Sequence, residues 1–403
     1  MRILYIHEYF TDTQKNGANI VAFNSYNAMK KAGHEVFFYA MQNPPYLYKQ
    51  PFENLFPPSH ITKGGIINSV KYRLNSVYNH TARRNLEKLL DEIKPDIVHV
   101  HSLLELSPSV LIAIKKKNIP YVMTVHDGGF ACPVMGTKYN LCQLCSSDVL
   151  NCLKHKCSRN NYLCSLYVML KFYISKIINK KYGANYYITP SNALKNYIDS
   201  CFNIQNIECV PNSLDNVFES VSPNYGNDGY FLYVGGLLDI KGVNILLNAV
   251  KMLPRNINFH IAGGGKDENK YKDFIFKNSL TNVKLLGKLS REELIKEYQN
   301  CIAVIVPSNW FEIFGMINIE AFINGKPVIA SRIGGIPEIV DDGINGLLFT
   351  AGDEAQLKEC ILKYINNPSL VVEHGKNAYK KASDEYTEEK YCKRLTEIYN
   401  NIK

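Results

Sequence analysis

The sequence predicts two α/β domains, each built on a parallel sheet with helices on both faces, and a cleft between them. The chain has 403 residues, and single domains cluster near roughly 100 to 200 residues. Strand-like and helix-like segments alternate through both halves, which is typical of doubly wound, Rossmann-like folds. Hydrophobic residues make up 46% and charged residues 21%, so we exclude a disordered or fibrous chain.

In the first 215 residues, short apolar runs alternate with segments of helical periodicity. The runs predict strands near 2–7, 34–40, 96–101, 120–126 and 184–190. The periodic segments predict helices over 18–32, 76–93, 107–117 and 191–201. The second helix should end before Lys94 and Pro95, because the residue that precedes a proline is disfavoured in a helix. The proline-rich segment 42–65 predicts an irregular excursion.

Residues 216–229 have no periodicity and contain Pro, Gly, Asn and Asp, so we predict a linker there. A second alternating series follows over 230–385. It predicts strands near 230–235, 257–262, 282–287, 303–307, 327–331 and 346–349, with helices near 242–253, 268–278, 291–300, 315–324 and 354–367. Residues 386–403 predict a C-terminal helix that crosses back to the first domain, which spans 1–215.

The formal net charge of +9 is unevenly distributed. Residues 1–190 hold 23 basic and 11 acidic residues, a balance of +12, and the rest of the chain has a balance of −3. A basic half predicts an anionic partner, whether a membrane surface, a phosphorylated acceptor or a nucleic acid.

The opening MRILYIHEYF reads as a strand and has none of the features of a signal peptide. No window reaches the length of apolar residues that a spanning helix needs. The eleven cysteines are then expected to be reduced thiols. We therefore expect a cytoplasmic protein, peripheral at the membrane face rather than integral.

The stretch PSNWFEIFGMINIEAFINGKPVIASRIGGIPEIV, residues 307–340, is the most informative. A strand should end at Ser308, a loop carries Glu312, and a helix beginning near Gly315 carries Glu320. A helix N-terminus offers unpaired N–H groups and a positive dipole end to a phosphate. The two carboxylates can then accept hydrogen bonds from hydroxyl groups on either side of a diphosphate, as a nucleotide sugar presents them.

Within this stretch EIFGMINIE resembles the two-glutamate motif of retaining GT-B glycosyltransferases of family 4, and the resemblance extends through residues 321–349. It implies a GT-B fold, with two facing Rossmann-like domains. It also implies that Glu312 binds the donor hexose and Glu320 the donor ribose. Backbone groups of four further residues would lie near the hexose and phosphates, namely Phe314, Gly315, Met316 and Ile317.

The segment YVGGLLDIKG, residues 233–242, follows a predicted strand. Glycines at Gly235 and Gly236 let the backbone approach a ligand, and Lys241 supplies a positive charge for phosphate. By resemblance, Lys241 contacts the donor diphosphate. The family's arginine is replaced here by Gly236, which removes one phosphate contact.

Two candidates lie in the first domain. Gly17, in QKNGANI, is the remaining member of a glycine pair whose first position is Asn16 here, and by resemblance it approaches the donor phosphates. His126 ends the run YVMTVHD, where a histidine can orient a substrate or move a proton. The resemblance places His126 against the donor sugar.

The resemblance implies transfer of a sugar with retention and without a catalytic metal or other cofactor. We expect a UDP- or GDP-sugar donor and a saccharide or lipid-linked saccharide acceptor, in cell-surface polysaccharide or glycoconjugate synthesis. Lys241, Glu312 and His126 are the expected catalytic residues. Two alternatives remain open: a GT-B sugar-nucleotide epimerase, and a nucleic-acid-binding protein with a zinc knuckle. The leading interpretation involves no nucleic acid.

Six cysteines lie within 132–164, in an insertion over about 128–165. Cys142 and Cys145 have the two-residue gap of a zinc knuckle, and Cys132 with Cys157 or Cys152 could complete a structural zinc site. Packed, reduced thiols are the equal alternative.

From Val149 to Tyr197 there are eight basic residues and no acidic residue, with apolar and aromatic side chains between them. This composition is typical of a helix that contacts an anionic membrane surface. A helix packed on the sheet with a solvated lysine edge is the competing interpretation.

Overall fold

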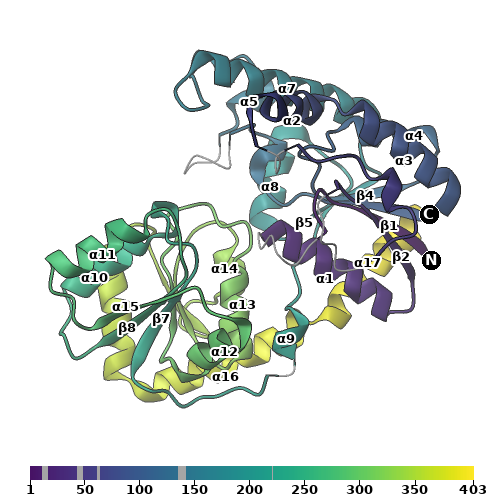
Figure 1. Ribbon diagram of the computed structural model, residues 1–403. Helices are drawn as coiled ribbons and strands as arrows, with labels where there is room; N and C mark the ends of the chain where they lie inside the picture. The colour runs from purple at the N-terminus through teal and green to yellow at the C-terminus, as the bar shows by residue number, and fades with distance from the viewer. Residues whose placement is uncertain (11–16, 43–48, 61–63, 135–141, 220) are drawn as a thin grey trace. The chain divides into compact units, whose positions relative to one another are not determined.

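The computed structural model describes residues 1–10, 17–42, 49–60, 64–134, 142–219 and 221–403. These residues form two compact units (Figure 1). Unit 1 comprises Met1–Val210 and Tyr391–Lys403, and unit 2 comprises Pro211–Lys390. No helix within the described residues is both long enough and apolar enough to span a bilayer.

Unit 1 is built on a six-stranded sheet in the order β2-β1-β3-β4-β5-β6, with every pair parallel. Its strands are β1 (Arg2–Ile6), β2 (Glu35–Tyr39), β3 (Ile97–Val100), β4 (Tyr121–Thr124), β5 (Tyr186–Thr189) and β6 (Ile207–Cys209). Every residue of β3 and β4 is buried, because central strands of a parallel sheet are covered on both faces.

Helices cover both faces of this sheet (Figure 1). They are α1 (Gly17–Lys31), α2 (Ile66–Val77), α3 (His80–Ile93), α4 (Ser109–Lys116), α5 (Leu144–Ser147), α6 (Asn151–Lys154), α7 (Tyr162–Tyr182), α8 (Asn192–Phe202) and α17 (Glu388–Ile402). On one face α3 packs on α4, α4 on α7, and α7 on α2. On the other face α17 is anchored by Tyr399, whose hydroxyl lies 2.6 Å from Nδ1 of His99 on β3.

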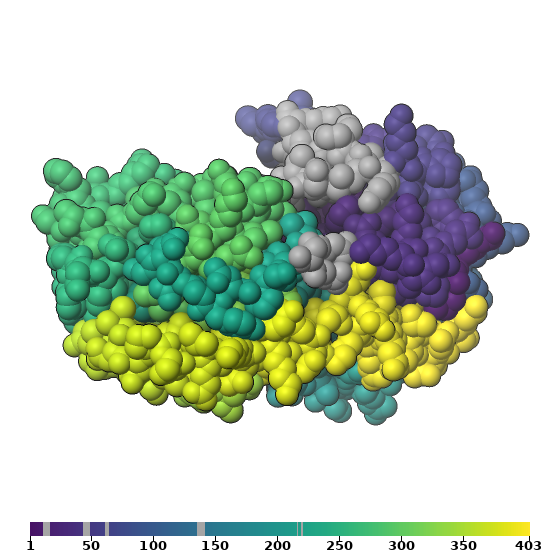
Figure 2. All heavy atoms as spheres, turned by 90° about the horizontal axis from the view of Figure 1, so that it is seen from below, coloured from purple at the N-terminus to yellow at the C-terminus, as the bar shows by residue number. Residues whose placement is uncertain are grey.

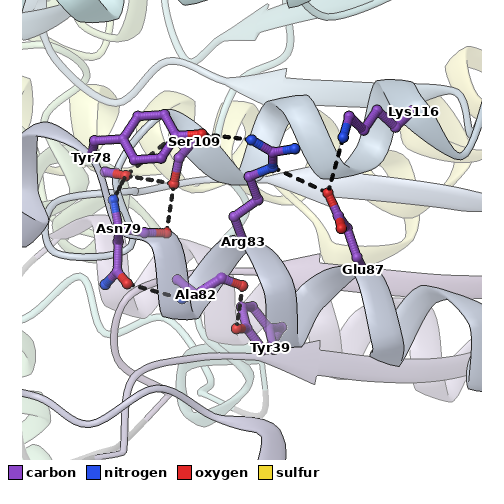
Figure 3. Close-up of polar contacts among 9 residues, drawn as sticks. Tyr39, Tyr78, Asn79, Ala82, Arg83, Glu87, Ser109 and Lys116 are labelled. Carbon is purple, nitrogen blue, oxygen red and sulfur yellow. Dashed lines mark hydrogen bonds and ion pairs between the residues drawn. The ribbon is translucent and has the colours of Figure 1, made fainter.

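The helix that the sequence predicted over 76–93 is interrupted. Asn79 has an extended backbone, and its side-chain oxygen accepts a hydrogen bond from Ala82 N at 2.9 Å, which begins α3. Asparagine is a favoured N-cap because it satisfies an N–H group that has no partner within the helix. Within α3, Arg83 donates hydrogen bonds to the Tyr78 hydroxyl and to the Glu87 carboxylate (Figure 3). The extended backbone at Asn79 therefore separates α2 from α3.

Strand β6 was missing from the sequence prediction. It has only three residues, Ile207–Cys209, at the edge of the sheet. A strand this short contains less than two periods of alternation, so its pattern is not distinctive.

Unit 2 has a second six-stranded parallel sheet, in the order β12-β11-β10-β7-β8-β9. Its strands are β7 (Tyr230–Val234), β8 (Asn258–Ala262), β9 (Val283–Gly287), β10 (Val304–Val306), β11 (Val328–Ser331) and β12 (Gly346–Phe349). All six lie where the sequence predicted strands. The predicted class, two doubly wound α/β units, is therefore confirmed.

The helices of unit 2 are α9 (Asn216–Glu219), α10 (Val243–Lys251), α11 (Glu268–Lys277), α12 (Arg291–Asn300), α13 (Met316–Ile323), α14 (Ile336–Ile339), α15 (Glu354–Asn366) and α16 (Pro368–Glu385). Alternate side chains of each strand enter separate cores. Phe231 and Tyr233 pack with α10 and α15, whereas Tyr230 and Leu232 pack with α13 and α16.

The linker predicted over 216–229 belongs to unit 2 in the structure. Phe218 is 3% exposed and lies in the core of that unit. Asn224 N donates to Asn324 O at 3.1 Å, and Lys376 of α16 lies over the ring of Tyr225. Residues 221–229 run along the surface of unit 2 beside α16 (Figure 2). After the four-residue helix α9, residues 221–229 form neither helix nor strand and pack through a few side chains, which explains the absence of periodicity.

Candidate functional site

The best candidate site in unit 2 lies at the carboxyl ends of β7 and β10. These neighbouring strands mark the point where the strand order reverses, since β8 and β9 lie on one side and β11 and β12 on the other. Ligands of open α/β sheets bind outside the strand ends at such a point. The sequence placed Lys241 and Glu312 after these two strands.

Glycines bring the loops at these strand ends into contact. Gly242 has a φ of +75°, and a Cβ atom there would lie 1.7 Å from the backbone oxygen of Pro307. Gly263 has a φ of +141°, and its Cβ atom would lie 1.8 Å from Gly235 O. A side chain at either position would push the loops apart, because L residues rarely adopt these angles and no space is present.

The carboxylate of Glu312 is held by two side chains. Lys241 Nζ donates to Glu312 Oε1 at 2.5 Å, and the Ser308 hydroxyl donates to the same oxygen at 2.6 Å. Lys241 is the last residue of the 3-10 turn Asp239–Lys241 after β7, and Ser308 follows β10. The Glu312 side chain is 15% exposed and that of Lys241 33% exposed, so the ion pair is partly shielded from water and reachable by a ligand.

The backbone of Glu312 is fixed by the loop after β11. Gly335 N donates to Glu312 O at 2.7 Å. Gly334 has a φ of +57°, and a Cβ atom there would lie 2.1 Å from Glu312 O. The glycine pair in SRIGGIPEIV thus allows close approach behind Glu312.

Helix α13 begins directly after the loop that carries Glu312. Its N-cap is Gly315, which has a φ of +104° and has no side chain to cap the first N–H groups. Phe314 is 5% exposed and packs edge-to-face against Tyr386, so only its backbone is available to a ligand. Met316 and Ile317 form the first turn of the helix. The positive end of the helix dipole therefore lies at the loop that carries Glu312.

Glu320 lies one turn further along α13. Its Oε2 accepts a hydrogen bond from the Tyr298 hydroxyl at 2.8 Å. Burial raises the pKa of Glu320, while Tyr298 and Arg291 lower it and Asp215 raises it. Arg291 forms an ion pair with Asp215, so Glu320 belongs to a polar cluster that the sequence did not reveal.

Gly235 and Gly236 form the loop after β7. Gly236 O accepts from the Tyr233 hydroxyl at 2.9 Å, and Gly235 N donates to Ala262 O at 3.0 Å. The Glu312 carboxylate adds to burial in raising the pKa of Tyr233. The loop is thus held by backbone and tyrosine contacts, with no arginine at position 236.

Two candidates belong to unit 1. His126 follows β4, and its Nε2 lies 2.8 Å from Nδ1 of His101 after β3. Burial lowers the pKa of His126 to about 4, so the imidazole is neutral near pH 7. Gly17 is the exposed first residue of α1, and a side chain there would meet no described atom within 4 Å. Residues 14–16 of the same motif lie outside the described residues.

The cysteines of the insertion are free thiols in the structure. The neighbouring Cys145 thiol, followed by burial, raises the pKa of the Cys132 thiol, and Cys157 adjoins Cys152. Within the described part of the chain no group of three His, Cys, Asp or Glu side chains is arranged to hold a metal ion. Residues 135–141 lie outside the described residues, and the zinc site of Cys132, Cys142, Cys145 and Cys157 stays a prediction.

Sequence reasoning missed three partners of the candidate residues, namely Ser308, Tyr298 and His101. Ser308 lies four residues before Glu312, so a polar residue at a strand end was the available signal. Tyr298 lies 22 positions before Glu320 and His101 25 positions before His126. Spacings this long carry no local pattern.

Comparison with known proteins agrees with these features. The sequence profile of Glycosyltransferase Family 4 matches residues 15–217, and that of Glycosyl transferases group 1 matches residues 216–381. An uncharacterized glycosyltransferase of Methanocaldococcus jannaschii is 36% identical over 215 residues, 53% of this chain and 59% of that protein. The capsular polysaccharide biosynthesis glycosyltransferase CapM of Staphylococcus aureus is 28% identical over 182 residues, 44% of this chain and 47% of its own.

Among solved structures, Anabaena HepE in complex with UDP-glucose matches with a TM-score of 0.70 and 17% identity, covering 100% of both chains. The fold is therefore GT-B, two α/β units each with a parallel sheet. The chain belongs to the group 1, family 4 glycosyltransferases.

Proposed function

We propose that this chain is a retaining glycosyltransferase that moves a hexosyl group from a UDP- or GDP-sugar to a saccharide or lipid-linked saccharide. The arrangement of Lys241, Ser308 and Glu312 beside the N-terminus of α13 carries the proposal. The family match and the UDP-glucose bound to the HepE structure support a nucleotide-sugar donor. The CapM relative supports a role in surface polysaccharide or glycoconjugate synthesis.

In this proposal the donor spans the two ends of this site. The diphosphate binds at the N–H groups of Gly315, Met316 and Ile317, where the helix dipole is positive, with Gly235 and Gly236 allowing backbone approach. Lys241 then exchanges its contact with Glu312 for a phosphate oxygen. The freed carboxylate of Glu312 accepts hydrogen bonds from hexose hydroxyls.

Glu320 lies on the other side of the diphosphate position, and its carboxylate accepts from the ribose hydroxyls. Tyr298 donates to Glu320 Oε2 at 2.8 Å and so fixes the orientation of this carboxylate. A fixed acceptor loses little entropy when the ligand binds.

Lys241 and the α13 N-terminus stabilise the negative charge that develops on the departing diphosphate. These positive groups perform the task that a metal ion has in other transferases, so we propose catalysis without one. His126 is neutral near pH 7 and orients the donor sugar or acceptor from unit 1. In retention the acceptor attacks from the face that the diphosphate leaves, and a phosphate oxygen takes the acceptor proton.

The test is turnover of UDP-glucose, UDP-galactose, UDP-N-acetylglucosamine and GDP-mannose, followed as nucleotide release with and without a metal chelator. Glu312→Gln should lower turnover by about 100-fold or more without lowering the melting temperature. Glu292→Gln is the matched control, because Glu292 is an exposed glutamate of the same unit. Full activity of Glu312→Gln would refute the site, and an epimerised donor without transfer would identify an epimerase.

We further propose that unit 1 contacts an anionic membrane surface through α7 and α2. On α7, Tyr162 is 56% and Leu163 78% exposed. On the adjoining α2, Ile66 is 85%, Ile67 72% and Leu74 65% exposed. Apolar side chains this exposed on two packed helices indicate an interaction surface, and a lipid bilayer can bury it.

The charge of these helices fits an anionic surface. Neither α2 nor α7 contains an acidic residue, and α2 adds Lys71 and Arg73 to the basic stretch. Two lysines of the basic stretch 149–197 already have partners within the protein. Lys176 donates to Ser146 O, and Lys154 pairs with Asp148 at 3.1 Å. Lys154 of α6 is thus neutralised by Asp148, Lys176 of α7 is held in place by Ser146, and α2 supplies additional positive charge.

A further inference from the structure

The carboxyl ends of β1 and β3 form the reversal point of the first sheet. The order is β2-β1-β3-β4-β5-β6, so β1 and β3 are neighbours with β2 on one side and β4 on the other. This is the position at which an open α/β sheet binds a ligand. Glu8 follows β1 and Glu105 follows β3, and both are no more than 1% exposed.

The two buried carboxylates differ in how they are bonded. Glu105 accepts from the Ser59 hydroxyl at 3.1 Å and from His60 N at 3.0 Å. Glu8 Oε1 accepts from Glu105 N at 2.9 Å. Glu8 Oε2 is buried and has no hydrogen-bond partner among the described residues, although Tyr9 is close enough to lower the Glu8 pKa.

An unpaired, buried carboxylate oxygen costs free energy, because it has lost its water without gaining a donor. Such groups are rare in folded proteins, and those that occur are commonly found where a ligand or water completes the bonding. Within the described part of the chain, Glu8 Oε2 is therefore a hydrogen-bond acceptor to which no donor is well aligned, at the place in the sheet where a ligand is expected.

Two helical side chains complete this cluster. Lys171 of α7 and Tyr72 of α2 are both half-buried and both interact electrostatically with Glu8. They lie on the same helix pair whose other side chains expose the apolar surface described above. Burial raises the pKa of Glu8 to about 7, although the hydrogen bond from Glu105 N and the charge of Lys171 lower it. Near neutral pH the carboxyl group is thus present in both charged and neutral forms.

We propose that Glu8, Lys171 and Tyr72 bind hydroxyl groups of the saccharide acceptor. An uncharged saccharide fits because its hydroxyls both donate and accept: one donates to Glu8 Oε2, and another accepts from Lys171 Nζ. The carboxylates of Glu8 and Glu105 repel an anion, and Lys171 repels a cation. The assignment rests on the proposed function, because that function supplies the acceptor.

The test uses the full chain and saturation-transfer NMR with methyl glycosides of glucose, galactose, mannose and N-acetylglucosamine. Wild type should bind at least one glycoside. Glu8→Gln and Lys171→Met should each weaken that binding about 10- to 100-fold, as expected for loss of a hydrogen bond to a charged group. Glu92→Gln and Lys180→Met are matched controls at exposed positions of the same unit, and they should bind as wild type does.

Two results would overturn the assignment: glycoside binding by Glu8→Gln equal to that of wild type, or no binding of any glycoside by wild type. Amide exchange of the β1 peptides shows that Glu8→Gln is folded. Thermal shift with UDP-glucose and GDP-mannose separates this inference from the proposed function. If neither nucleotide sugar binds, the proposed function fails, while the glycoside measurement still reports on Glu8.

Discussion

Lys241 Nζ lies 2.5 Å from Glu312 Oε1, and the two residues come from loops that follow different strands of the second sheet. The side chains are 33% and 15% exposed, so the pair is neither a solvated surface bridge nor a fully buried one. In a partly shielded ion pair, the lysine can move to a charged group of a ligand, and the carboxylate that it leaves remains accessible to water or to ligand hydroxyls. This is the arrangement that a diphosphate site needs before the donor binds.

We expect Lys241→Met to lower turnover of the nucleotide sugar by about 100-fold, because the departing diphosphate loses a positive charge. Lys241→Arg should retain part of the activity. The measurement is nucleotide release at saturating donor, with Lys277→Met as the control at an exposed lysine of unit 2. Equal turnover in Lys241→Met and wild type would contradict the phosphate role.

The fold was predictable from the sequence because both sheets consist of buried parallel strands, whose apolar runs are easily separated from the helices between them. The errors have local causes. The helix predicted over 76–93 begins only at His80, where Asn79 caps α3, while α2 over Ile66–Val77 was not predicted, and β6 is too short to show a pattern. Residues 216–229 resembled a linker because their packing depends on isolated side chains such as Phe218.

The contacts of the candidate site were predictable only in part. Lys241 and Glu312 follow strand ends and belong to recognisable motifs, so their positions could be anticipated. Tyr298 and Glu8 carry no motif. Their roles depend on which strands become neighbours, as when Glu105 N meets Glu8 Oε1 across 97 positions of sequence. Contacts of this kind arise from topology and have no local signature.

The membrane contact predicts a loss of vesicle binding when α2 or α7 receives a negative charge. Ile67→Asp and Leu163→Asp should each weaken binding to vesicles of phosphatidylcholine and phosphatidylglycerol by about tenfold or more, since burying such a side chain contributes roughly 1.5–3 kcal/mol. Cosedimentation measures the effect. Phe276→Asp is the matched control, because Phe276 is 85% exposed in unit 2.

Added salt should also weaken vesicle binding by wild type, because lysines and arginines supply part of the attraction. Binding to pure phosphatidylcholine as strong as binding to the anionic mixture would contradict the charge contribution. Unchanged binding by both aspartate variants would show that α2 and α7 do not enter the bilayer surface.

Asn79→Ala should destabilise unit 1 by about 2 kcal/mol. The substitution removes the cap on Ala82 N, which is bonded at 2.9 Å (Figure 3). It also removes the donor to Glu105 O, which is bonded at 2.8 Å. Amide exchange of the α3 peptides measures the loss locally. The single tryptophan, Trp310, lies in unit 2, so its fluorescence should report an unchanged transition in the same variant. Asn400→Ala, at an exposed position of unit 1, should change exchange little.

Glu8 predicts a specific pH dependence of stability in unit 1. Its pKa is raised from 4.5 to about 7, chiefly by burial and further by the Glu105 carboxylate, while the Glu105 backbone N–H, Lys171 and Tyr9 lower it. Between these pH values the folded state binds a proton that the unfolded state has released, so the free energy of unfolding falls as the pH rises. The carboxyl group alone should remove about 3 kcal/mol between pH 4.5 and 7.

Glu8→Gln has no such ionisation, so it should be more stable than wild type at pH 8, and the difference should disappear near pH 5. The buried histidines of unit 1 act in the opposite direction, because burial lowers the pKa of His7 and His99 to about 3, but they are present in both proteins and cancel in the comparison. Amide exchange of the β1 peptides at the two pH values measures the difference. A stability difference between the two proteins that does not change with pH would show that Glu8 is not titrating in this range. Because Glu8→Gln is expected to be the more stable protein near neutral pH, any loss of saccharide binding in that variant reflects the missing carboxylate and not unfolding.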